Sequence, residues 1–199
     1  CVPSGWVSGI SESVREFAEK FARHCGCKYG VATNSGTTAL HLALVTLDVK
    51  RGDEVIIPSF TMISTPNAVT YTGAMPVLVD AEPFTWNIDV SKIKEKITKR
   101  TKVIMPVHIY GHPVDMDIVL ELGEKCGLSV VEDAAEAHGA EYKDKKVGCF
   151  GDMACFSFYA NKIITTGEGG MIVTNNEELA EKARWLGSHA FGRGGQHFF

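Results

Sequence analysis

Short apolar runs that alternate with helical patterns constrain the fold of this chain more than any other feature of its sequence. Seven runs of five or six residues predict strands, at residues 29–33, 54–58, 75–80, 102–107, 128–133, 153–158 and 170–174. Continuous apolar strands between helices are typical of a parallel sheet that is buried on both faces. We therefore predict an α/β fold with a mostly parallel central sheet and helices on both of its faces.

The segments between these strands carry helical spacing. Helices are predicted at residues 10–24, 37–47, 64–71, 89–97, 115–126 and 176–186. In the first of them, Val14, Phe17 and Phe21 recur at helical spacing behind Ser11, a suitable N-cap. No internal repeat or low-complexity linker divides the 199 residues, so we predict one domain. Because the chain begins at Cys1 without a methionine and ends without a closing helix, we expect a fragment of a longer protein.

Charge and cysteine content argue against several classes of function. A formal net charge of −4 and a pI of about 6.0 give no basic surface for nucleic acid or for an anionic membrane. No apolar stretch reaches membrane-spanning length. Cys25 and Cys27 have no second pair at zinc-ligand spacing, so we expect no metal site. Cys126 and Cys155 lie in apolar segments, which predicts buried free thiols and a cytoplasmic location.

The residues that follow each strand are the first place to look for a site, because ligands of parallel α/β sheets bind at the carboxyl ends of the strands. The first strand is followed by Asn34-Ser35-Gly36-Thr37-Thr38, which opens a helix. Backbone N–H groups at such a helix start, with Gly36 and hydroxyl groups beside them, can bind a phosphate. A capped helix start without any ligand has the same pattern. Neither the dinucleotide-binding sequence GxGxxG nor a P-loop is found here.

Lys162 lies between an apolar strand and a Gly-rich turn, in the sequence FSFYANKIITTGEGG. A charged amine is costly to bury beside Ile163 and Ile164, because it is strongly hydrated. A lysine at a strand end whose amine reaches water would explain this stretch taken alone. The alternative is covalent chemistry, since a lysine amine can form a Schiff base with a carbonyl cofactor such as pyridoxal phosphate. The choice depends on whether the chain supplies the other groups that this cofactor needs.

Asp133 is one such group. It ends a strand, where a carboxylate can keep the pyridine nitrogen of pyridoxal phosphate protonated, or can only cap the next turn. Glu136 and His138 are near enough in sequence to reach the same pocket, although a lone histidine is more often structural. Ser157 could donate to the phosphate, and Met62 could lie against the ring or in the core. Phosphate cradle, acid and lysine occur in this order, each after a strand, which favours the cofactor.

Several long motifs resemble those of one known family. The nucleotide-sugar aminotransferases of the DegT/DnrJ/EryC1/StrS family carry segments similar to NSGTTALHLAL, GDEVIIPSFTMISTPNAV, PVHIYGHPVDMD, VEDAAEAHGA and FSFYANKIITTGEGGMIVT, and the similarity runs from about Ser4 to the end of the chain. These are fold-type-I pyridoxal-phosphate enzymes. The resemblance implies that residues 1–199 form the large, cofactor-binding domain, and that a smaller C-terminal domain lies beyond them.

The resemblance also implies roles for single residues. Lys162 matches the Schiff-base lysine, and Asp133 matches the partner of the pyridine nitrogen. The remaining matches are cofactor-binding positions: Gly36, Thr37 and Ser157 at the phosphate, Thr38 at its rim, Glu136 near the ring hydroxyl, and Met62 on the ring, where relatives often have an aromatic residue. Relatives that have histidine in place of Lys162 act as dehydratases, so the lysine favours transamination.

The implied reaction moves an amino group from L-glutamate to the C4 ketone of a nucleotide-linked 4-keto-6-deoxy sugar, for the biosynthesis of polysaccharides or glycosides. The segments FTMI and EDAAEAHGA are most similar to members that aminate GDP-4-keto-6-deoxymannose. Trp6, His108 and Tyr110 are candidates for sugar recognition, but His108 and Tyr110 could equally be packing residues after a strand. Subunits of the family share their active sites, which implies a homodimer or a larger assembly.

Two alternatives remain open at this point. One is a regulatory protein of the same family that binds the cofactor without turnover. The other is a nicotinamide-dependent dehydrogenase on a similar sheet, although the missing GxGxxG sequence argues against it.

Overall fold

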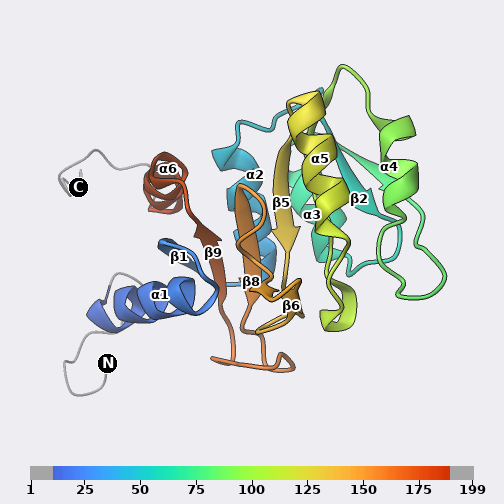
Figure 1. Cartoon of the computed structure of the whole chain (residues 1–199). Helices are drawn as coiled ribbons and strands as arrows, with labels where there is room; N and C mark the ends of the chain where they lie inside the picture. The colour runs from blue at the N-terminus through green and yellow to red at the C-terminus, as the bar shows by residue number, and fades with distance from the viewer. Residues whose placement is uncertain (1–10, 189–199) are drawn as a thin grey trace.

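A seven-stranded sheet forms the centre of the molecule (Figure 1). The computed structural model describes residues 11–188, so the predicted helix start at Ile10 and the candidate Trp6 lie outside the described residues. The strand order is β1 (Tyr29–Thr33), β9 (Gly170–Thr174), β8 (Met153–Ser157), β5 (Ser129–Asp133), β4 (Thr101–Ile104), β2 (Glu54–Pro58) and β3 (Met75–Val79). Among these strands only β9 runs antiparallel to its neighbours, which confirms the prediction of a mostly parallel sheet.

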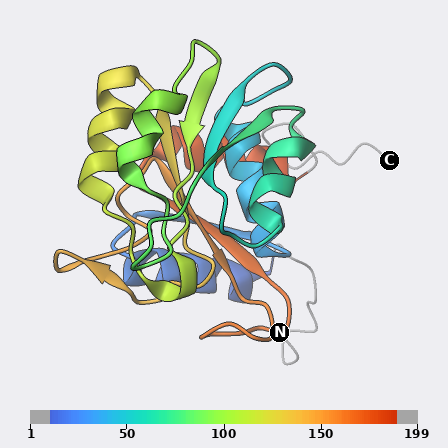
Figure 2. The same cartoon turned by 90° about the vertical axis from the view of Figure 1, so that its right-hand side faces the viewer.

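Helices cover both faces of this sheet, as Figure 2 shows. One face packs against α2 (Gly36–Thr46), α3 (Ser64–Tyr71) and α6 (Glu177–Gly187), whose buried side chains join one hydrophobic core. The other face packs against α1 (Glu12–His24), α4 (Val90–Lys96) and α5 (Met116–Cys126), which fill two further cores. The inner strands therefore lie in a buried layer, whereas the edge strands β1 and β3 are partly exposed. The carboxyl ends of the inner strands are the places where polar side chains reach an open surface.

Most predicted elements are present with ends shifted by one to three residues. The N-cap prediction for Ser11 is confirmed, because its hydroxyl accepts a hydrogen bond from the backbone N–H of Val14. The strand predicted at residues 102–107 ends at Ile104, because Pro106 has no N–H to continue the ladder. The sequence patterns did not predict the short hairpin of β6 (Glu141–Tyr142) and β7 (Lys145–Lys146), nor the 3₁₀ turn η2 (Ile109–Gly111).

The five cysteines within residues 11–188 are all free. Cys155 is buried on β8, as predicted. The same prediction is wrong for Cys126, which is exposed because it ends α5, after the residues Met116, Val119 and Gly123 that face the sheet. No helix in the described range is long and apolar enough to cross a membrane. The same residues contain no cluster of His, Cys, Asp or Glu side chains suited to a metal ion.

Candidate active site

A cavity of about 300 Å³ lies at the carboxyl edge of the sheet. It is lined by the start of α2, by the segment after β2 and by the residues that follow β5 and β8. Seven of the predicted site residues line it together: Gly36, Thr37, Met62, Asp133, Glu136, Ser157 and Lys162. A larger hollow of about 480 Å³ lies beside α5 and the start of β5, and none of the predicted site residues lines it. The smaller cavity is therefore the candidate active site.

The start of α2 forms one wall of this cavity. The Ser35 hydroxyl accepts a hydrogen bond from the Thr38 N–H, and the Thr38 hydroxyl accepts one from the Ser35 N–H, so the two residues cap the helix reciprocally. The N–H groups of Gly36 and Thr37 have no intrahelical acceptor, and they lie at the positive end of the helix dipole. This arrangement suits a phosphate group. Thr38 serves the cap and does not line the cavity, and its assignment to the phosphate rim stays a prediction.

Gly36 allows this wall to approach β8 closely. A Cβ atom at Gly36 would lie 2.8 Å from the Cβ of Ser157, which is closer than side chains tolerate. Any larger residue would push the start of α2 away from Ser157. The contact thus places the helix N-terminus and the Ser157 hydroxyl side by side, as two groups that could hold one anion.

Asp133 reaches the cavity from the end of β5. Its carboxylate accepts hydrogen bonds from the Thr65 hydroxyl (2.8 Å) and from the Ala135 N–H (3.2 Å). Burial raises the pKa of Asp133 above its usual range, although these hydrogen bonds oppose the shift. Within residues 11–188 no Lys, Arg or His forms an ion pair with it. A cationic ligand group would therefore stabilise its charged form.

Thr65 is a site residue that the sequence patterns did not indicate. It lies in the first turn of α3, three residues after Met62, and its hydroxyl also contacts that of Thr61. The one available signal was its spacing, because a residue one helical turn from a cavity-lining position shares the same face. It orients Asp133 by donating the hydrogen bond that fixes one carboxylate oxygen.

Lys162 points into the cavity. Its Nζ lies 3.0 Å from Glu136 Oε1, and only 13% of its side chain is exposed. The second oxygen of Glu136 accepts the backbone N–H of Tyr110 at 3.0 Å. A carboxylate holds the amine inside the cavity, which favours a site role for Lys162 over the alternative of a strand-end lysine whose amine reaches water.

His138 lies outside the cavity, among the rings of Phe21, Phe156 and Phe158. Neither of its ring nitrogens has a hydrogen-bond partner among the described residues, and burial lowers its pKa. This environment agrees with the interpretation of His138 as a structural residue and not as a site residue. Of the candidates for sugar recognition, His108 is fully buried and does not line the cavity, which agrees with the alternative of a packing residue. Tyr110 is 77% exposed beside the cavity, and its role in sugar recognition stays a prediction.

Comparison with known proteins gives a consistent result. The family model of the DegT/DnrJ/EryC1/StrS aminotransferase family matches residues 1–199. The GDP-perosamine synthase of Caulobacter vibrioides is 55% identical over 186 residues, which are 94% of this chain and 50% of that protein.

Solved structures agree with this match. The structure of DesV from S. venezuelae has a TM-score of 0.90 and 42% identity, and the match covers 94% of this chain and 51% of that one. A sugar aminotransferase of Streptococcus pneumoniae in its PLP form has a TM-score of 0.88 and 32% identity, covering 93% and 52%. The chain spans about half the length of the curated relatives it matches.

Proposed function

Because the chain belongs to the DegT/DnrJ/EryC1/StrS aminotransferase family, we propose that it binds pyridoxal 5′-phosphate and aminates a nucleotide-linked sugar. The amino group would come from L-glutamate, and the acceptor would be the C4 ketone of a 4-keto-6-deoxy sugar used in polysaccharide or glycoside biosynthesis. One observation carries the proposal: the Lys162 amine, the Asp133 carboxyl group and the N-terminus of α2 line the same cavity.

The residues present fit this cofactor. A buried carboxyl group without a cationic partner among residues 11–188 suits a protonated ring nitrogen. The free N–H groups at the start of α2 and the Ser157 hydroxyl suit the phosphate. Met62 is 57% exposed beside the cavity and offers a polarisable surface to a flat ring. Each of these groups would therefore contact one part of the cofactor.

The reaction divides among the side chains in a definite way. When bound, pyridoxal phosphate supplies a carbonyl group and a ring that accepts electrons from the substrate carbon. Asp133 would keep a proton on the ring nitrogen. The Lys162 Nζ, held at 3.0 Å by Glu136, would hold the cofactor and then take up and return a proton as a general base. Only 13% of the Lys162 side chain is exposed, which limits the contact of this amine with water.

The proposed nucleotide is guanosine diphosphate, because the C. vibrioides relative is a GDP-perosamine synthase. The test is mass spectrometry of products after incubation of the purified full-length protein with L-glutamate and a panel of keto-sugar nucleotides. We expect an amino sugar linked to GDP, and no product from Lys162→Ala. The matched control is Lys182→Ala, which removes a surface ion pair with Asp48 and should leave turnover unchanged.

The same experiment separates the alternative of a regulatory protein. A regulatory protein would bind the cofactor but produce no amino sugar. Turnover that survives in Lys162→Ala would instead show that Lys162 is not the lysine that binds the cofactor.

We further propose that residues 1–199 form the cofactor-binding domain of a homodimer or larger assembly in the cytoplasm. Free thiols at all five described cysteines suit a reducing compartment. Met62, Ile63 and Ile163 are exposed apolar residues at or beside the cavity rim, which suits contact with a second subunit. Analytical ultracentrifugation of the purified protein tests this assembly, and a monomer at all concentrations would contradict it.

A further inference from the structure

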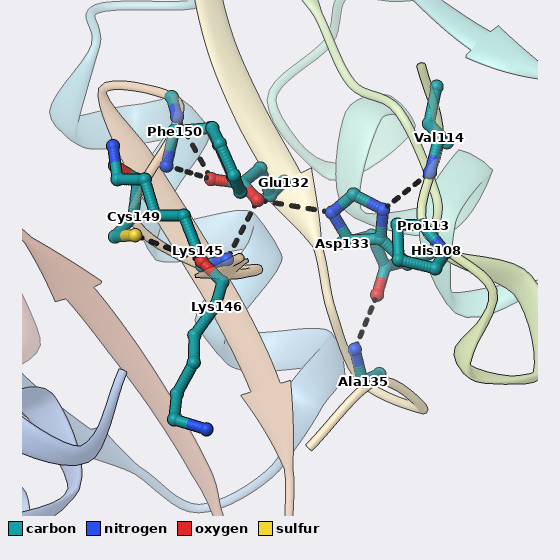
Figure 3. Close-up of polar contacts among 12 residues, drawn as sticks. His108, Pro113, Val114, Glu132, Asp133, Ala135, Lys145, Lys146, Cys149 and Phe150 are labelled. Carbon is teal, nitrogen blue, oxygen red and sulfur yellow. Dashed lines mark hydrogen bonds and ion pairs between the residues drawn. The ribbon is translucent and has the colours of Figure 1, made fainter. Parts of the chain in front are cut away.

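Glu132 is a fully buried carboxylate directly beside Asp133, yet it does not line the cavity. Consecutive strand residues point to opposite faces, so Glu132 faces the helical layer of α1 and α5. Its two oxygens accept four hydrogen bonds, from the N–H groups of Gly148, Phe150 and Gly151 and from the ring of His108 (Figure 3). Burial alone would raise the pKa of Glu132, but these hydrogen bonds hold it below its usual value. The structure thus retains a buried charge at considerable cost.

His108 connects this carboxylate to the backbone of Asp133. Its Nδ1 accepts the N–H of Val114 at 3.1 Å, so the ring proton lies on Nε2 and is donated to Glu132 (Figure 3). The backbone N–H of His108 donates to the carbonyl of Asp133 at 3.0 Å, and the Asp133 N–H donates to the carbonyl of Pro106 at 2.9 Å. A single residue therefore binds Glu132 through its ring and Asp133 through its backbone.

We propose that the buried His108–Glu132 pair is a positioning pair for Asp133. It fixes the end of β5 between residues 106–108 and the turn that precedes β8, and so directs the Asp133 carboxyl group into the cavity. This inference rests on the proposed function, in which Asp133 binds the ring nitrogen of the cofactor. A role in stability alone does not explain the pair, because apolar side chains of similar volume fill such a site at lower cost.

The pair also supports the other side of the cavity. The segment that His108 opens continues to Tyr110, whose N–H binds the Glu136 carboxylate that holds Lys162. Asn87 fixes the same segment by accepting the N–H of Ile109. A displaced His108 would therefore disturb both the acid and the lysine, through the backbone and without touching either side chain.

The test compares Glu132→Gln with Glu54→Gln, a matched control. Glu54 is also a buried carboxylate with hydrogen-bond partners, Thr98 and Arg100, but it begins β2 at the opposite edge of the sheet. Both variants should melt at lower temperature. Only Glu132→Gln should weaken pyridoxal phosphate binding, by about tenfold as for outer partners of metal ligands, and shift the pH midpoint of the bound cofactor's absorbance. Equal affinity and midpoint in the two variants would overturn the proposal.

A second pair of variants separates the two contacts of the His108 ring. His108→Gln retains an N–H donor near the position of Nε2, whereas His108→Asn retains an acceptor near the position of Nδ1. We expect the Gln variant to bind the cofactor more tightly than the Asn variant, because the bond to Glu132 is the one that matters. These variants also serve if Glu132→Gln does not fold. Equal binding by both, at the level of the unchanged protein, would contradict the proposed role.

Hydrogen exchange of the cofactor-free protein tests the positioning by itself. Relative to other core amides, the amides of His108 and Asp133 should exchange faster in Glu132→Gln or His108→Asn but not in Glu54→Gln, whose lower stability speeds the exchange of all core amides alike. Exchange at both amides that rises no more than at other core amides would overturn the positioning role. Absence of cofactor binding by the unchanged protein would instead overturn the proposed function, so the two failures are distinguishable.

Discussion

Glu132 and Asp133 are adjacent carboxylates on β5, and burial acts on both of them. Four hydrogen bonds hold the pKa of Glu132 low, so it is a fixed anion. Asp133 accepts one hydroxyl and one backbone N–H, and burial raises its pKa. At the scale of single residues, the surroundings therefore keep Glu132 charged in a fixed position, whereas the charge of Asp133 depends on whether a ligand is bound.

Replacement of Asp133 by Asn should stabilise the cofactor-free protein and impair cofactor binding. The raised pKa means that the folded state binds a proton more readily than the unfolded chain, so the charged carboxylate costs stability as pH rises above its ordinary value of about 4. Asn carries no charge, and we expect a gain of about 1 kcal/mol at neutral pH. Thermal unfolding without cofactor measures it. A lower melting temperature for Asp133→Asn would contradict the account.

His138 should make stability depend on pH. Burial lowers its pKa in the folded protein, whereas in the unfolded chain it takes up a proton near pH 6.5, its ordinary value. The unfolded state therefore binds more protons below about pH 6.5, and stability is lost as pH falls through that range. His138→Leu should reduce the loss. Urea unfolding at about pH 7.5 and about pH 5.5 gives the comparison. His41, whose pKa burial also lowers, is unchanged in both proteins and cancels. An equal loss in both proteins would contradict this role.

At the scale of elements, the contact between α2 and β8 sets the shape of the phosphate side of the cavity. Gly36→Ala would force the helix start from Ser157, because the added Cβ would lie 2.8 Å from the Ser157 Cβ. We expect a stability loss of about 1–3 kcal/mol and weaker binding of pyridoxal phosphate. Gly123→Ala is the matched control, since its Cβ would lie 3.0 Å from Val130 Cγ2, away from the cavity. Equal cofactor affinity in both variants would contradict the role of Gly36.

The elements themselves were largely predictable from local patterns. Continuous apolar runs identified all seven strands of the main sheet, because the inner strands are buried on both faces. The edge strand β3 has an apolar run too, although it exposes Met75 and Leu78. The hairpin of β6 and β7 was not predicted, because its strands are two residues long and polar. The turn at Tyr110 was not predicted either. The left-handed backbone there (φ 50°) depends on contacts with Asn87 and Glu136, which no local pattern encodes.

The predicted site shows the same division. Lys162, Asp133 and Gly36 were indicated because each follows a strand, and the sheet brings strand ends together. The sequence did not indicate Thr65 or the His108–Glu132 pair, because their importance comes from hydrogen bonds between segments that are far apart in sequence. For His108, sugar recognition and packing both stayed open, since a polar residue after a strand gives no sign of whether its side chain is buried.

At the scale of the whole molecule, the sheet gathers one functional edge from segments spread over the chain. The cavity draws on residues from Ser35 to Glu168, so no short piece of the sequence contains it. The chain spans about half the length of its curated relatives, and the choice of sugar is proposed to depend on surfaces beyond the cavity described here. What the described residues do define is the cofactor end of the site: phosphate wall, acid and lysine.

Covalent mapping of the cofactor tests whether Lys162 is the lysine that binds it. Pyridoxal phosphate would be added to the purified protein, the complex reduced with borohydride, and the digested protein mapped by mass spectrometry. We expect the added mass on Lys162, and its loss in Lys162→Arg, because this amine lies inside the cavity beside Asp133 and Glu136. Label spread over exposed lysines such as Lys94 and Lys99, with Lys162 unmodified, would contradict it.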